Sequence, residues 1–164
     1  MTSTITTSAD TVEVPIRLDI DTTVPAFSRA LTSLDAAAAR ELDRAGIEVG
    51  LRELVRLRAS QLNACAYCVA QHSHDALTAG EPIGRVAAVS VWRESPFFSV
   101  RERAAFALTD TVTRLVDTHV PDSEWREAAA HLTPPELGAV LALVVAINAW
   151  NAVGVTTRAW TPTL

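Results

Sequence analysis

Two cysteines, a histidine and a glutamate lie within twenty residues of one another in a largely apolar part of the chain. Cys65 and Cys68 are the only cysteines and have the spacing C-x-x-C; His72 follows Cys68 by four residues, and Glu53 precedes Cys65 by twelve. In a reducing compartment, such a pair of thiols is typical of a redox-active or metal-binding site. We therefore take residues 53–72 as the candidate functional site.

The spacing favours one of the two nearby histidines. In an α-helix each residue turns the chain by about 100°, so relative to Cys65, Cys68 falls at about −60° and His72 at about −20°. His74 falls at about 180°, on the opposite face. We therefore expect His72 to serve the thiols and His74 not to. A four-ligand zinc site would need both histidines and is disfavoured, and a three-ligand site completed by water or Glu53 is the remaining metal alternative.

The two cysteines are expected to differ in role. The thiolate is the nucleophile, and a helix N-terminus, a neighbouring sulfur and an imidazole one turn away each favour it. Cys68 lies one full turn before His72, so we expect Cys68 to be the activated sulfur and Cys65 its partner in a reversible disulfide. Glu53, on the preceding helix, would orient His72 or relay its proton. The alternative is that both cysteines are small buried packing residues.

Composition restricts the class of protein. A chain of 164 residues is long enough for one domain with a substantial core. With 14 basic and 19 acidic residues the net charge is −5, and no basic cluster occurs, so nucleic-acid and anionic-membrane partners are not expected. All 14 basic residues are arginines, which excludes a catalytic lysine. The N-terminal sequence lacks the pattern of a secretory signal peptide, which predicts a cytoplasmic protein.

Apolar periodicity predicts an all-α fold of about seven helices, with no alternating strand pattern. Residues 1–22 are predicted to be an extended or mobile leader, and residues 23–164 a single helical domain. Asn63 is the expected N-cap of the cysteine-bearing helix, and Ser99 with Glu102 suggests a capping box. The last helix is apolar only over Leu137–Ile147 and is expected to lie in the core rather than in a membrane. The expected helices are 25–46, 48–63, 63–80, 82–91, 99–119, 124–132 and 133–153.

Three stretches of the sequence carry a more specific signal: LRELVRLRASQLNACAYCVAQHSHDALTAGEP (51–82), WRESPFFSVRERAAFAL (92–108) and NAWN (148–151). From about Pro25 onward the chain resembles the alkylhydroperoxidase D-like, carboxymuconolactone decarboxylase superfamily. The resemblance implies a helical alkylhydroperoxidase D-like fold that assembles as a homo-oligomer, a trimer or hexamer. It also implies thiol-dependent peroxidase or disulfide reductase activity. In that activity Cys68 becomes the sulfenic acid, Cys65 resolves it, and Glu53 and His72 relay the proton.

The sequence departs from alkylhydroperoxidase D proper between the cysteines, where that branch has a histidine and this chain has Ala66 and Tyr67. This difference groups the chain with the broader relatives and weakens the transfer of a lipoyl-type reductant. The lactone decarboxylase branch does not need the cysteine pair, so a lyase is disfavoured. We predict a peroxiredoxin-type oxidoreductase with a hydroperoxide substrate, an external dithiol or protein reductant, and no cofactor or metal. A redox-responsive oligomeric binding or scaffold protein with negligible turnover is the alternative.

Overall fold

A computed structural model describes residues 12–162, and within that range helices are the only regular secondary structure, as predicted. Two short helices, α1 and α7, bring the number of described α-helices to nine, and a 3-10 turn over Val89–Val91 follows α5. The α-helices are α1 (Ile20–Thr23), α2 (Pro25–Ala45), α3 (Val49–Leu62), α4 (Ala66–Thr78), α5 (Ile83–Ala88), α6 (Val100–Thr113), α7 (Leu115–Thr118), α8 (Asp122–His131) and α9 (Pro134–Thr157).

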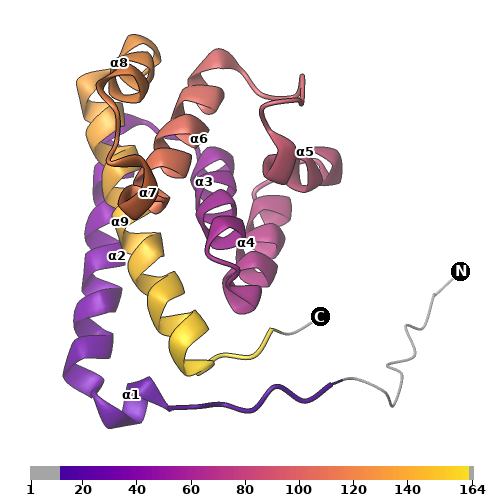
Figure 1. The fold of residues 1–164 in the computed structure, drawn as a ribbon, viewed down its shortest axis with the longest axis vertical. Coiled ribbons are helices and arrows are strands. Elements are labelled where there is room, and N and C mark those ends of the chain that lie inside the picture. The colour runs from indigo at the N-terminus through magenta and orange to yellow at the C-terminus, as the bar shows by residue number, and fades with distance from the viewer. Residues whose placement is uncertain (1–11, 163–164) are drawn as a thin grey trace, which may run out of the picture.

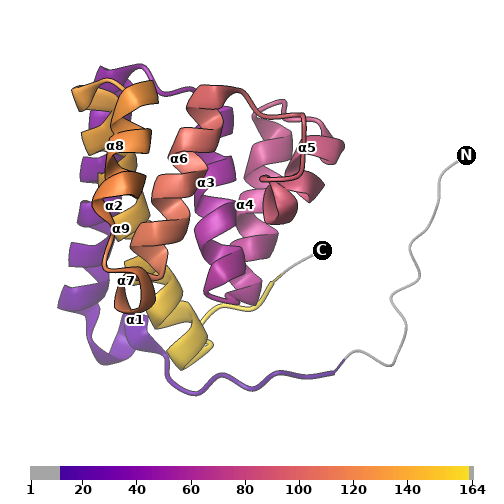
Figure 2. The same cartoon turned by 45° about the horizontal axis from the view of Figure 1, so that its top comes forward.

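Helix α3 is at the centre of the fold. It packs against α4, α6 and α9, while α9 also packs against α2 (Figures 1 and 2). In both views α2 and α9 form one side of the molecule, and α4 and α5 form the other. A side chain of α3 that points toward α4 is therefore screened from solvent by helices on several sides, which matters for Glu53.

The core is formed by side chains of α2, α3, α6 and α9, and its largest members are almost completely inaccessible to solvent. They include Leu42, Leu54, Phe106, Leu143 and Val144. Within residues 12–162, α9 is the one helix long and apolar enough to cross a membrane. Because α9 contributes core residues against α2, α3 and α6, its apolar character has a structural explanation inside the protein, as the sequence predicted.

Several helix ends follow directly from local sequence signals. Gly46 ends α2 in the left-handed conformation (φ 68°), which glycine adopts without strain. Ser99 and Glu102 form the predicted capping box at the start of α6. Thr133 and Glu136 form a second capping box at the start of α9, where Pro134 and Pro135 occupy the first turn. Each of these signals depends only on residues within one turn of the boundary.

The prediction of one helix over residues 99–119 was wrong. The helix breaks at Arg114 (φ −99°, ψ 36°), which separates α6 from α7. The Thr118 hydroxyl donates to the Thr111 carbonyl at 2.7 Å, so this carbonyl is satisfied without a continuous helix. Leu115 and Val116, which continued the apolar stripe in the sequence, are consequently exposed.

The folded region begins earlier than the predicted boundary at residue 23. The backbone N–H groups of Arg17 and Leu18 donate to the carbonyl of Thr157 at 2.8 and 3.2 Å. Asp19 then caps α1 by accepting from the N–H groups of Asp21 and Thr22. The part of the predicted leader from Arg17 onward is thus fixed against the end of α9, whereas residues 1–11 of that predicted leader lie outside the described residues.

Candidate functional site

The turn between α3 and α4 positions the cysteines. Asn63 is the C-cap of α3, and Ala64 takes a left-handed conformation (φ 54°), which lets the Cys65 N–H donate to the Ser60 carbonyl at 3.0 Å. Helix α4 therefore starts at Ala66 with Cys65 as its N-cap, so the prediction of Asn63 as N-cap was wrong. Cys68 lies in the first turn, as expected, and Cys65 immediately precedes it.

Cys65 and Cys68 form a disulfide in the structure, with their Cα atoms 5.3 Å apart. This separation lies within the range that disulfides require. The Cys65 sulfur also accepts a hydrogen bond from the Cys68 N–H at 3.4 Å, in the manner of a helix cap. Both cysteines are buried, so reagents reach the sulfurs only by way of a cavity.

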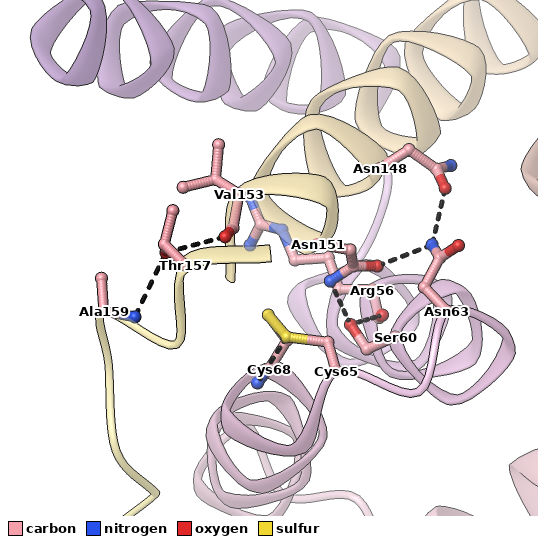
Figure 3. The surroundings of a disulfide bond; sticks show 10 residues. All are labelled: Arg56, Ser60, Asn63, Cys65, Cys68, Asn148, Asn151, Val153, Thr157 and Ala159. Carbon is pink, nitrogen blue, oxygen red and sulfur yellow. Dashed lines mark hydrogen bonds between the residues drawn. A yellow bond between two sulfur atoms is a disulfide. The ribbon is translucent and has the colours of Figure 1, made fainter. Parts of the chain in front are cut away.

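A network of amides holds α9 against this turn (Figure 3). The side-chain amide of Asn63 donates to the side-chain oxygens (Oδ1) of Asn148 and Asn151, at 2.7 and 3.0 Å. Asn151, which is completely buried, donates in turn to the Ser60 hydroxyl at 3.1 Å. The two asparagines of the NAWN stretch therefore fix the cysteine-bearing turn, and Asn63 acts as their partner instead of capping α4.

Glu53 and His72 meet between α3 and α4. The Nδ1 atom of His72 lies 2.8 Å from Oε2 of Glu53, whose side chain is buried. The other carboxylate oxygen of Glu53 accepts from Nη1 of Arg56 at 2.6 Å, and Nη2 of Arg56 donates to Asp35 of α2 at 3.1 Å. The result is a chain of charged groups from α2 through α3 to the imidazole on α4.

The charge of Glu53 is stabilised by its partners. Burial alone would raise the pKa of Glu53, but the hydrogen bond from His72 and the nearby guanidinium of Arg56 outweigh that effect and hold the pKa below its usual value. Glu53 is therefore a carboxylate at neutral pH and acts as the acceptor, so Nδ1 of His72 is the donor. The second ring nitrogen, Nε2, is then left to exchange a proton with other groups.

A cavity of about 510 Å³ lies in front of Cys68 and His72. Cys68 is among its lining residues, and Cys65 is not. Cys65 lies against α9 instead: a Cβ atom placed on Gly154 would be 3.2 Å from the Cys65 sulfur, so a glycine lets the helix approach this closely. The two sulfurs thus differ in access, and a small molecule in the cavity meets Cys68 first.

The four residues predicted for the site lie close together, and His74, which was predicted to face away from the cysteines, lies apart from them. Cys68 and His72 line one cavity, Glu53 contacts His72 and Cys65 pairs with Cys68 without lining it, whereas His74 is exposed on the far side of α4. Sequence reasoning missed the remaining members of the site. Arg56 had a signal, because it lies one turn after Glu53 on the same helix. Trp150 lies within the NAWN stretch, although its place in the cavity was not predicted, whereas Asp21, Asp35 and Trp160 come from distant parts of the chain and had no signal.

Glu53, His72 and Asp75 bring one potential metal-ligand atom each to within 4.8 Å of one another. Protein groups already account for these atoms. Both oxygens of Glu53 are bonded, to His72 and Arg56, and Asp75 accepts from the amide of Gln71 at 3.0 Å. The adjacent guanidinium of Arg56 also opposes a second positive charge at this place. The donor set is therefore better explained as an internal hydrogen-bond network.

A family model described as the carboxymuconolactone decarboxylase family matches residues 25–111, a range that contains Glu53, both cysteines and His72. The chain belongs to this family. Among curated proteins, YdfG of Bacillus subtilis, itself uncharacterized, is 32% identical over 104 residues, which cover 63% of this chain and 71% of YdfG. The resemblance noted from the sequence is thereby confirmed.

Two solved structures share the helical fold. A protein of unknown function from Agrobacterium tumefaciens, whose name suggests an AhpD antioxidant defence protein, has 30% identity and a TM-score of 0.84 over 92% of this chain and 100% of its own. An uncharacterized peroxidase-related protein from Silicibacter has 17% identity and a TM-score of 0.71, over 82% of this chain and 69% of its own. The latter likeness supports the fold alone. Together they confirm an alkylhydroperoxidase D-like fold.

Proposed function

We propose that this family member is a thiol-dependent hydroperoxidase in which Cys68 is the reactive sulfur. The observation that carries the proposal is the shared cavity: Cys68 and His72 line it together, and Nδ1 of His72 is held by the buried carboxylate of Glu53. A nucleophile, a base and a group that orients the base are the parts that an activated thiol requires. Cys65 lies within disulfide distance behind Cys68.

The first chemical step reduces the peroxide. In the reduced protein His72 accepts the thiol proton of Cys68, and the thiolate attacks the terminal oxygen of a hydroperoxide ROOH. The S–O bond forms as the O–O bond breaks, and the leaving alkoxide takes a proton from the His72 imidazolium and departs as ROH. Two electrons pass from sulfur to the peroxide, and Cys68 is left as a sulfenic acid.

The second step forms the disulfide. The thiol of Cys65 attacks the Cys68 sulfenic acid, the S–S bond forms, and the hydroxyl group leaves as water with the Cys65 proton. Cys65 needs no access to the cavity for this step, only to Cys68. An external dithiol then reduces the pair by thiol–disulfide exchange and is itself oxidised to a disulfide. The reductant is an external dithiol or protein thiol, and a homo-oligomeric assembly remains part of the proposal.

The proposal is tested by counting thiols. The protein is reduced, freed of reductant, and mixed with one equivalent of cumene hydroperoxide; the expected result is the loss of two thiols per chain and the appearance of one equivalent of the alcohol. Cys68→Ser should lose essentially no thiol, with Ala66→Ser, at an exposed position between the cysteines, as the matched control. Retention of both thiols in the wild type, or equal loss in Cys68→Ser, would refute the function.

A further inference from the structure

The cavity in front of Cys68 has an aromatic wall and an acidic rim. From these two features we propose that its substrate is an organic hydroperoxide with an apolar or aromatic body and no negative charge, and that hydroperoxides carrying a carboxylate are disfavoured. This inference rests on the proposed function and names the substrate class for that same site. The volume, about 510 Å³, is within the range of pockets that hold small organic ligands.

The apolar side of the cavity comes from three aromatic residues. The ring of Trp160 lies 5.8 Å from the ring of Tyr67 and 5.4 Å from that of Trp150, measured between centroids. Tyr67 is on α4 next to Cys68, Trp150 is on α9, and Trp160 follows α9 in the C-terminal segment. All three are only partly buried, and all line the cavity. A continuous aromatic surface beside the reactive sulfur offers contact area to an apolar or aromatic substrate.

Trp160 is held in this wall by the N-terminal segment. Its indole N–H donates to Oδ2 of Asp21 at 3.3 Å, and the backbone bonds of Arg17 and Leu18 to Thr157 fix the same two segments together. The position of Trp160 in the wall therefore depends on both ends of the described chain. Neither end belongs to the cysteine-bearing helices, so this feature can vary while the cysteine site remains the same.

The charges that line the cavity are mostly negative. Asp21, Asp35 and Asp75 line it, against one guanidinium, that of Arg56. Arg56 is already paired: it donates to Glu53 at 2.6 Å and to Asp35 at 3.1 Å. The imidazole of His72 faces the Glu53 carboxylate, which would compensate its charge when protonated.

Among the described residues, the cavity therefore offers no uncompensated cation to a substrate carboxylate. Such a carboxylate would instead lose its hydration shell beside three like charges. A hydroperoxide without charge avoids this cost and keeps the contact with the aromatic wall. The negative charges and the aromatic wall of the cavity thus both favour a hydroperoxide without a carboxylate.

The test uses three hydroperoxides that share the cumyl hydroperoxide group and differ in the charge of the para substituent: cumene hydroperoxide, with hydrogen at that position, its para-carboxylate and its para-trimethylammonium derivative. Single-turnover thiol loss of the reduced protein is followed at low ionic strength, so that no external reductant enters the measurement. The neutral and cationic compounds should react at least about tenfold faster than the carboxylate. The difference should shrink as salt is added, because exposed charges are screened.

A variant tests whether the carboxylates that line the cavity cause this selectivity. Asp75→Asn keeps the shape of the side chain and should narrow the ratio between the neutral compound and the carboxylate at least threefold. Any effect on the chemistry of Cys68 cancels in this ratio. Asp122→Asn removes a charge at an exposed position of α8 away from the cavity and should leave the ratio as in the wild type.

Two results would overturn the inference, and they are distinguishable. Equal rates for the three compounds, or fastest reaction with the carboxylate, would contradict the substrate class while the hydroperoxidase function stood. Thiol loss with none of the three would overturn the function and this inference with it.

Discussion

The Nδ1 atom of His72 on α4 lies 2.8 Å from the Oε2 atom of Glu53 on α3. This contact joins two helices that meet only because the turn over residues 63–65 reverses the chain. It fixes which ring nitrogen carries the proton, since an ionised carboxylate can only accept. The imidazole is thus oriented before any substrate arrives.

Glu53→Gln should slow thiol loss by about 100-fold, the lower end of what general acid–base catalysis contributes. The amide carries no charge and has a single acceptor oxygen, so it cannot accept from both His72 and Arg56 as the carboxylate does. The measurement is the second-order rate constant for peroxide-driven thiol loss at neutral pH. Glu41→Gln, in an exposed ion pair with Arg44, is the matched control and should react at the wild-type rate. A wild-type rate in Glu53→Gln would contradict the relay.

The free energy of unfolding should depend on pH partly through the ionisation of Glu53. The pKa of Glu53 in the folded protein lies below its usual value of 4.5, so its ionisation contributes stability that is fully present above about pH 4.5. That contribution is lost as the pH falls through the lowered value. Urea unfolding at a series of pH values should therefore show that the free energy of unfolding falls less steeply toward acid pH in Glu53→Gln than in the wild type. Parallel curves would be inconsistent with a lowered pKa.

Two partly buried arginines of α3, Arg56 and Arg58, allow an effect on stability to be distinguished from an effect on the site. Arg56 pairs with Glu53 and Asp35, and Arg58 pairs with Asp110 of α6, with similar burial of the two side chains. Arg56→Met and Arg58→Met should each lower the free energy of unfolding by about 3 kcal/mol, because a buried carboxylate loses its partner. Only Arg56→Met should also slow thiol loss. The same slowing in Arg58→Met would show that the effect is a general one on folding.

The Asn151 side chain should be needed for the position of the cysteine turn. Asn151→Ala removes one hydrogen-bond partner from Ser60 and one from Asn63 inside the protein and should lower the free energy of unfolding by about 1–3 kcal/mol. Thr156→Ala, at an exposed position of the same helix, should have little effect. Denaturant unfolding compares the two, and equal stabilities would mean that the amide network contributes nothing.

The helix ends that depend on residues within one turn were predictable from the sequence. Those that depend on contacts between more distant residues were not. Gly46, the Ser99–Glu102 box and Thr133 mark boundaries through residues in the same turn, and the structure has helix ends there. The break at Arg114 depends on Thr118 reaching Thr111, and periodicity does not report such a contact. Likewise Asn63 has the residue type of an N-cap, but its amide is taken up by α9.

The reactive residues of the candidate site were predictable from the sequence, whereas its cavity was not. Helical register and the family resemblance singled out the two cysteines, His72 and Glu53, and they are the residues that the turn brings together. The cavity was not predictable, because Trp160 and Asp21 come from opposite ends of the described chain and meet only after folding. The oligomeric state, the cytoplasmic location and the identity of the reductant stay predictions.

The most direct test of the account asks which sulfur is oxidised first. Cys65→Ser removes the resolving thiol, so a sulfenic acid formed at Cys68 persists and can be trapped with dimedone. After one equivalent of cumene hydroperoxide, mass spectrometry of the digested protein should find the adduct on the peptide that contains Cys68. The same treatment of Cys68→Ser should give no adduct on Cys65. An adduct on Cys65 in Cys68→Ser, together with none on Cys68 in Cys65→Ser, would contradict the central claim.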